Sequence, residues 1–341
     1  MRNSLVLAGF VAVGLLGINP TPALSQDALG GGASFPNAVY QKWIEMAKAQ
    51  IGITIQYSSA GEAGAGQSKV LAREIDFAVS GLPMPASMRS AGNLLQFPVV
   101  IGAVVPVFNI PGVASGQLRL NGALLAKIFA GGIKRWNDPA IVAINPGISL
   151  PDLEIRPVSI RDAGAGASFG FTQYILAADA EWRDKHGTIV TRRWAVGSNV
   201  EDASAMVETV KGLSGSIGYM PYGLAMRTKQ PLVALSNPAG KFLVPTLSGI
   251  AAAAANADWN GATDLVMTLV NQPGEESWPI AQTSYAQIPL DPQDPARSKA
   301  VRRFFDFAYG QGGSILADLG FVPLSPDVQN RARALWTKVG S

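Results

Sequence analysis

One pattern in the sequence is typical of a nucleophile: Gly166-Ala167-Ser168-Phe169-Gly170 matches G-x-S-x-G. In hydrolases with this pattern the serine lies on a sharp turn between a strand and a helix, and a histidine base must follow an acid later in the chain. The one histidine, His186, comes soon after the helix that Ser168 would open, with no acid in a separate loop between them. A secreted serine hydrolase using Ser168 therefore remains only an alternative. The residues favour a helix start whose N–H groups face an anion.

Arg161 is the most informative charged residue, because it directly follows a predicted strand, 154–160, and precedes a glycine-rich run. A guanidinium in that position can form two parallel hydrogen bonds to an oxyanion that the following backbone N–H groups also hold. The alternative is an ion pair with the neighbouring Asp162. Both can be true at once, with the aspartate orienting the arginine.

Three glycine-rich stretches, at residues 30–36, 61–66 and 162–168, are predicted to form turns or loops, and each precedes a predicted helix. The first turn of a helix has unpaired N–H groups and partial positive charge, so it can hold an anion without a cationic side chain. Glycine allows the backbone to approach such a ligand closely. Any one stretch can be an ordinary connection, but the three together indicate an anion-binding protein.

The elements that must position these residues alternate between strand and helix. Apolar alternation and apolar runs predict strands at 51–57, 75–80, 97–110, 154–160 and 215–219. Helical spacing predicts helices at 38–49, 67–72, 121–130, 171–178, 201–210, 250–257 and 300–309. This order predicts an α/β protein with mostly parallel strands, and the length suggests two domains.

Composition excludes several classes of protein. The chain has 27 basic and 24 acidic side chains, a formal charge of +3, and no stripe of Lys and Arg, so neither nucleic acid nor an anionic membrane is expected as a partner. With no cysteine it has no disulfide, no thiolate metal site and no acylated lipoprotein cysteine. No HExxH motif and no Walker loop occurs, so no metal and no cofactor is expected.

Residues 1–25 have the pattern of an export signal. Arg2 gives a positive start, the apolar stretch Leu5–Ile18 is shorter than a membrane span, and Ala23-Leu24-Ser25 fits the cleavage rule for small residues. We expect the mature chain to begin near Gln26 and to reside in the periplasm after cleavage of the signal peptide.

Several motifs resemble the Pst-type periplasmic phosphate-binding proteins of bacterial ABC importers, in the same order and along nearly the whole mature chain. They are Gly31-Gly32-Ala33-Ser34-Phe35-Pro36 with Tyr40 and Trp43, Leu95-Gln96-Phe97-Pro98 to Asn109-Ile110-Pro111-Gly112, Lys134-Arg135-Trp136-Asn137-Asp138, Ile217-Gly218-Tyr219 with Tyr222, Trp278-Pro279-Ile280, and Phe304-Phe305-Asp306 with Ala308-Tyr309.

The resemblance implies a type II periplasmic binding protein, with two α/β lobes joined by two crossing strands and a ligand cleft between the lobes. Lobe I would comprise residues 26–101 and 280–341, and lobe II residues 102–279. Such a protein is a monomeric binding protein rather than an enzyme. Its partners would be inorganic phosphate or a related oxyanion and the transmembrane permease subunits of an ABC importer.

The resemblance also implies which residues bind the ligand. From lobe I these are Ser34, through its hydroxyl and N–H, and the Phe35 N–H. From lobe II they are Arg161 and the N–H groups of Gly166 and Ala167. The expected binding set further includes the loop residues Glu62, Asp162 and Ala165.

Some residues depart from the family pattern. Ser80-Gly81-Leu82-Pro83-Met84 stands where relatives have Ser-Asp-x-Pro-Leu, and that aspartate accepts the proton of bound phosphate. Ala163, Ala165 and Ala167 replace the usual aspartate and the hydroxyl side chains after the arginine. Two hypotheses follow. Either Glu62 replaces the acceptor, so that phosphate or arsenate is chosen over sulfate, or the pocket takes a different ligand such as a phosphonate or a phosphate ester.

Overall fold

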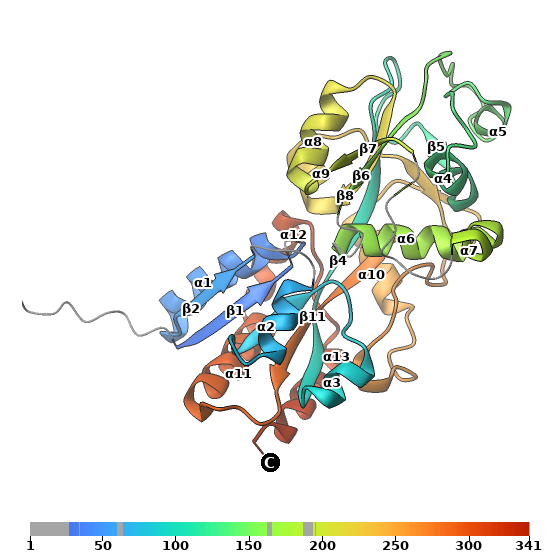
Figure 1. Cartoon of the computed structure of the whole chain (residues 1–341). Coiled ribbons are helices and arrows are strands. Elements are labelled where there is room, and N and C mark those ends of the chain that lie inside the picture. The colour runs from blue at the N-terminus through green and yellow to red at the C-terminus, as the bar shows by residue number, and fades with distance from the viewer. Residues whose placement is uncertain are drawn as a thin grey trace, which may run out of the picture.

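The computed structural model describes residues 27–33, 35–59, 64–161, 166–186, 194 and 196–340. Two α/β lobes share one eight-stranded sheet (Figure 1). The strands are β1 (Ala28–Gly32), β2 (Ile55–Ser58), β3 (Phe77–Ser80), β4 (Leu94–Phe108), β5 (Arg119–Leu120), β6 (Arg156–Ile160), β7 (Ser198–Val200), β8 (Ser216–Pro221), β9 (Ala234–Ser236), β10 (Phe242–Leu243) and β11 (Ala281–Pro289). The predicted export signal, 1–25, lies outside the described residues.

Helices flank the sheet in both lobes (Figure 1). They are α1 (Asn37–Ile51), α2 (Ala65–Leu71), α3 (Ala86–Ala91), α4 (Gly122–Phe129), α5 (Pro139–Val142), α6 (Gly166–Ala178), α7 (Ala180–His186), α8 (Ala203–Gly212), α9 (Tyr222–Arg227), α10 (Leu247–Ala255), α11 (Pro295–Gly310), α12 (Leu316–Leu319) and α13 (Pro326–Leu335). Among these helices, none combines the length and the apolar character that a membrane span requires.

The strand order is β2-β1-β3-β11-β4-β8-β6-β7. Pairing is parallel in the outer groups, β2-β1-β3 and β8-β6-β7, and antiparallel from β3 through β11 and β4 to β8. A small separate sheet has the order β10-β9-β5. The prediction of an α/β fold is therefore confirmed. The expected mostly parallel strands form the two outer groups of the large sheet, whereas its three central pairings are antiparallel.

Strand β4 passes from one lobe to the other. Its residues 94–103 pair with β11, and its residues 104–108 pair with β8. Every residue of β4 is buried, which explains the apolar run, interrupted by two prolines, that predicted a strand at 97–110. Pro98 does not break the strand because the register with β11 shifts there, and a proline is tolerated at such a bulge.

The prediction that Gly30–Gly32 forms a turn is wrong, because these residues belong to strand β1. A Cβ atom on Gly30 would lie 2.1 Å from Cζ of Phe77, and one on Gly32 would lie 1.9 Å from the Val79 carbonyl oxygen. Gly32 also has a φ of +143°. Glycine is needed here so that β1 can pass under the Phe77 ring and end close to β3.

Candidate anion-binding site

Three chain segments meet where the two lobes come together. Phe35 follows β1, Gly81 directly follows β3, and Gly166 begins α6 after β6. A Cβ atom on Gly166 would lie 3.1 Å from Cβ of Phe35, and one on Gly81 would lie 3.2 Å from Cα of Gly166. Each residue comes after the carboxyl end of a strand in a parallel group, which is where open α/β sheets bind ligands. The structure therefore brings predicted residues from both lobes into direct contact.

The start of α6 supplies backbone donors to this meeting point. In Figure 1, α6 lies on the side of its lobe that faces the other lobe. Gly166, Ala167 and Ser168 form its first residues and are buried. N–H groups in a first helical turn have no acceptor within the helix, and they carry the positive end of the helix dipole. The first turn of α6 can therefore bind an anion without a cationic side chain.

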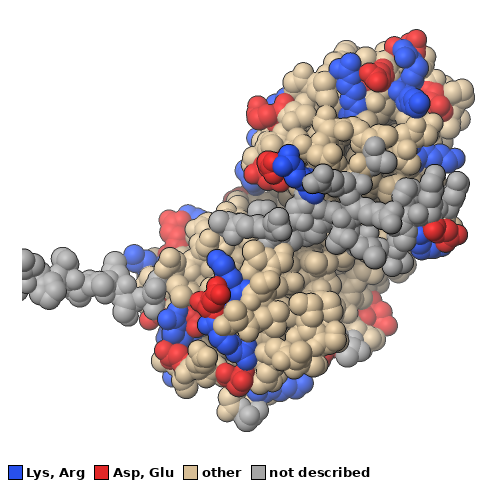
Figure 2. Space-filling view, in the orientation of Figure 1, with Lys and Arg blue, Asp and Glu red and all other residues tan. Residues whose placement is uncertain are grey.

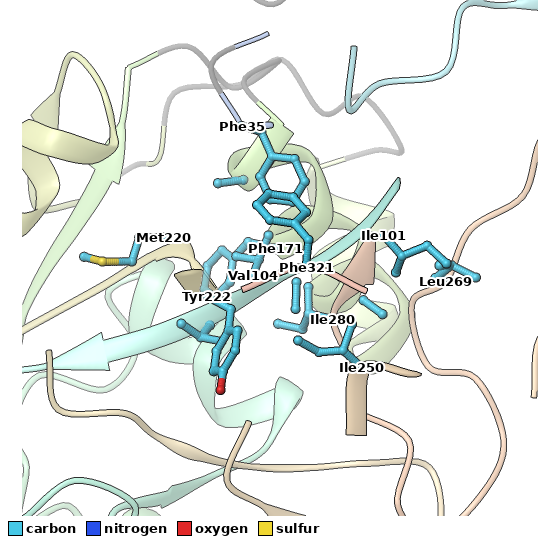
Figure 3. Close-up of a cluster of buried hydrophobic side chains, with 14 of the residues drawn as sticks. Phe35, Ile101, Val104, Phe171, Met220, Tyr222, Ile250, Leu269, Ile280 and Phe321 are labelled. Atoms are coloured by element: carbon cyan, nitrogen blue, oxygen red, sulfur yellow. The ribbon is translucent and has the colours of Figure 1, made fainter. Parts of the chain in front are cut away.

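Apolar side chains pack beneath the meeting point. The Phe35 ring is buried and lies edge-on to the Phe321 ring, with 5.4 Å between their centroids. Figure 3 shows these rings in a buried cluster together with Val104, Phe171 and other side chains from both lobes. This packing positions the Phe35 backbone opposite α6.

Arg161 lies at the carboxyl end of β6, as the sequence predicted, and its backbone N–H donates to the Val200 carbonyl at 2.7 Å. Its guanidinium is about half exposed and forms an ion pair of 2.7 Å with Glu201. The expected partner Asp162 lies outside the described residues, as do the predicted binding residues Ser34, Glu62 and Ala165.

Glu201 was missed as a partner of Arg161, because it was assigned to the beginning of a predicted helix. The pairing of the two strands would have indicated this contact. β6 and β7 are parallel neighbours with Ile160 opposite Val200, so the residues that follow them, Arg161 and Glu201, must lie side by side.

Ser168 does not have the geometry of a hydrolase nucleophile. Its side chain is fully buried within α6, and its Oγ lies 3.0 Å from the Tyr219 hydroxyl on β8. A nucleophile elbow instead exposes its serine at a sharp turn before the helix. Ser168 is therefore a buried polar residue whose hydroxyl has a hydrogen-bond partner, as buried polar groups usually do.

Gln282 on β11 was also missed in the sequence analysis as a neighbour of Gly81. It is buried, and its Nε2 donates to the Gly81 carbonyl at 3.0 Å. No feature of the sequence near residue 282 connects it to residue 81. Only the antiparallel pairing of β11 with β3 and β4 brings the two residues together.

Within the described part of the chain, no group of three His, Asp or Glu side chains could hold a metal ion. On the face shown in Figure 2, Lys and Arg side chains are mixed with Asp and Glu on both lobes. Among the described residues, the groups that lie at the meeting point of the lobes and could donate to an anion are the first backbone N–H groups of α6 and the buried amide of Gln282.

Comparison with known proteins identifies the family. The model of the PBP superfamily domain matches residues 19–311. The phosphate-binding protein PstS of Pasteurella multocida is 39% identical over 312 residues, which cover 92% of this chain and 90% of that protein.

This chain belongs to the PstS family of phosphate-binding proteins.

Solved structures of phosphate-binding proteins share the fold of this chain. A high-affinity periplasmic phosphate-binding protein, PfluDING, solved with phosphate bound, has a TM-score of 0.71 at 20% identity, covering 91% of this chain and 93% of that one. The phosphate-binding protein from Stenotrophomonas maltophilia has a TM-score of 0.66 at 16% identity, covering 90% and 93%. The resemblance in the sequence and the two-lobe fold that it implied are both confirmed.

Proposed function

We propose that this chain is a periplasmic solute-binding protein that captures inorganic phosphate between its two lobes and delivers it to the transmembrane subunits of an ABC importer. One observation carries the proposal: the first turn of α6 in one lobe lies against Phe35 and Gly81 of the other. The relatives are named as phosphate-binding proteins, which supports phosphate as the ligand. Proteins of this kind bind and release their solute and do not transform it, so we propose no enzymatic activity.

The two lobes would be residues 26–101 with 280–341, and residues 102–279. A ligand held by both lobes stabilises the closed state through contacts that the open state does not make. The separation of Phe35 and Gly166 is short enough for a small anion to be contacted by both lobes at once.

The proposed contacts come from three loops. Ser34 and Phe35 bind from lobe I, with Glu62 as a second lobe I contact. Arg161 and the N–H groups of Gly166 and Ala167 bind from lobe II, in a loop that also contains Asp162 and Ala165.

Isothermal titration calorimetry of the mature protein tests the proposal, with phosphate, arsenate, sulfate, phosphite and methylphosphonate as titrants. We expect phosphate to bind and to be preferred over sulfate. The absence of phosphate binding at millimolar concentration would reject the proposed function.

A second candidate ligand is another oxyanion, such as arsenate, a phosphonate or a phosphate ester. Gly81 favours it, because glycine offers no side-chain acceptor for the proton of bound phosphate. Tighter binding of methylphosphonate than of phosphate in the same titrations would establish this candidate.

We also propose that the chain is exported and its signal cleaved. Mass spectrometry of protein recovered from the periplasm should give a chain that begins near Gln26. A chain that retains Met1 in that fraction contradicts cleavage.

A further inference from the structure

Gln282, the second residue of β11, fills the space between Gly81 and helix α6. The residue is 5% exposed. A Cβ atom on Gly81 would lie 2.5 Å from Nε2 of Gln282, and one on Gly170 would lie 2.6 Å from its Oε1. The amide therefore occupies volume that side chains at both glycines would need. The long side chain of Gln282 fits here because Gly81 has no side chain.

The orientation of this amide follows from its contacts. The Gly81 carbonyl can only accept, so the nitrogen of the amide must face it, and Nε2 lies 3.0 Å away. Oε1 then faces Gly170, buried and without a partner in the described part of the chain. A cavity of about 20 Å³ borders Gln282 and Thr283 there and is large enough for one water molecule. The nitrogen is the end of the amide that faces the meeting point of the lobes.

The amide nitrogen has one donor to spare. A side-chain amide carries two N–H groups, and the Gly81 carbonyl accepts from one of them. The same Nε2 lies 3.4 Å from the place where a Cβ atom on Gly166 would be, so it lies against the first turn of α6. An oxyanion held by the N–H groups of that turn would be within reach of the second N–H.

We propose that Gln282 is a ligand-binding residue whose second amide N–H donates to an oxygen of the oxyanion that carries no proton. This inference rests on the proposed function and specifies one of its contacts. An N–H donor at this position replaces the carboxylate acceptor that the family pattern has at residue 81. This donor favours a deprotonated oxygen of the ligand, which accepts more strongly than a hydroxyl oxygen, so a protonated oxygen should face another part of the site.

Phosphate calorimetry on Gln282→Met tests this contact. Methionine keeps most of the side-chain volume and removes the donor. Gln287→Met is the matched control, because Gln287 is a fully buried glutamine on the same strand whose Nε2 donates to Gln96 at 2.8 Å. We expect the Kd for phosphate to rise about ten-fold or more for Gln282→Met, since hydrogen bonds to charged groups are the strong ones. We expect less than about a two-fold change for Gln287→Met. Binding by Gln282→Met within two-fold of the wild type, or equal losses in both variants, would overturn the inference.

Gln282→Glu is a second test that preserves the shape of the side chain. The ratio of variant to wild-type Kd for phosphate, measured between about pH 5.5 and pH 8, cancels the titration of phosphate itself. Ionisation of a carboxylate beside the anion should make this ratio rise about ten-fold or more with pH, whereas Gln287→Glu should give a flat ratio. A ratio that stays within about two-fold of one at every pH overturns the inference, also if Gln282→Met does not fold. Wild-type protein that binds no phosphate contradicts the proposed function instead.

Discussion

The proposed backbone donors at Gly166 and Ala167 would bind a dehydrated anion without the conformational cost of ordering long side chains. Both residues are buried in the first turn of α6, so the helix fixes the direction of their N–H groups. No side-chain conformational entropy is lost when they bind a ligand. This explains how a site can hold an oxyanion although alanine replaces hydroxyl side chains in the same loop.

Arg161→Ala should weaken the binding of any oxyanion. The guanidinium offers charge-assisted hydrogen bonds, and the loss of one such bond costs about 1.5–3 kcal/mol, or roughly ten- to a hundred-fold in Kd. Titration of phosphate and sulfate into the variant measures the effect. Arg156→Ala is the control, since Arg156 begins the same strand and pairs with Glu154 at an exposed position. Equal affinities of Arg161→Ala and wild type would exclude Arg161 from the site.

Glu62→Gln should change selectivity more than affinity. If Glu62 accepts the proton of bound phosphate, the neutral amide removes the reason to reject sulfate, which has no proton to donate. We expect the ratio of sulfate to phosphate Kd to fall by about ten-fold. An unchanged ratio would show that Glu62 does not select the ligand.

At the level of single elements, glycine determines where β1 can run. Gly30→Ala would bring a Cβ atom to 2.1 Å from the Phe77 ring, which packs edge-on against Phe305 in the core. We expect the variant to lower the free energy of unfolding by about 1–3 kcal/mol, as over-packing of a core does. Urea denaturation followed by circular dichroism measures the loss.

Gly310→Ala is the control for this prediction. Gly310 ends α11, and a Cβ atom there would meet nothing within 4 Å. A helix favours alanine over glycine, so this variant should be as stable as the wild type or slightly more stable. Equal stability of Gly30→Ala and Gly310→Ala would contradict the account of β1.

The sequence predicted those helices and strands whose own residues have a characteristic pattern, such as an apolar run or a capping residue. The apolar run predicted β4 within a few residues, and Asn121, which caps α4 by accepting from the Leu124 N–H, lies at the predicted start of that helix. The strand at Gly30–Gly32 could not be predicted, because glycine locally indicates a turn and only the Phe77 ring makes it necessary here. The same is true of Gln282 and Glu201, whose roles depend on which strands pair.

At the scale of the whole molecule, segments from early and late in the sequence pack together in one lobe. Tyr40 of α1, Phe77 of β3 and Phe305 of α11 form one aromatic cluster, with ring centroids 5.3 Å apart for Phe77 and Phe305 and 6.3 Å apart for Tyr40 and Phe305. Away from this cluster, a Cβ atom on Gly223 of α9 would lie 1.9 Å from the carbonyl oxygen of Leu319 at the end of α12. The lobes therefore make a close backbone contact as well as sharing β4.

Gly166→Ala should hinder the approach of the two lobes. Its Cβ atom would lie 3.1 Å from Cβ of Phe35, so the lobes would have to separate slightly. We expect phosphate binding to weaken by about ten-fold, while the free energy of unfolding stays equal or rises slightly because alanine favours the helix. Calorimetry gives the affinity, and small-angle scattering with saturating phosphate gives the radius of gyration.

Gly212→Ala is the control for lobe closure, because Gly212 ends α8 and has no neighbour within 4 Å of a Cβ atom. It should bind phosphate and compact as the wild type does. A Gly166→Ala variant that binds and compacts equally well would contradict the role of this contact.

The position of β11 in the sheet has a consequence for how the protein is made. β3 and most of β4 pair with β11, which begins only at Ala281. When the ribosome has synthesised all the earlier strands, β3 still lacks a neighbour on that side, and the first lobe cannot complete its sheet. The polypeptide therefore stays incompletely folded until almost its whole length has emerged.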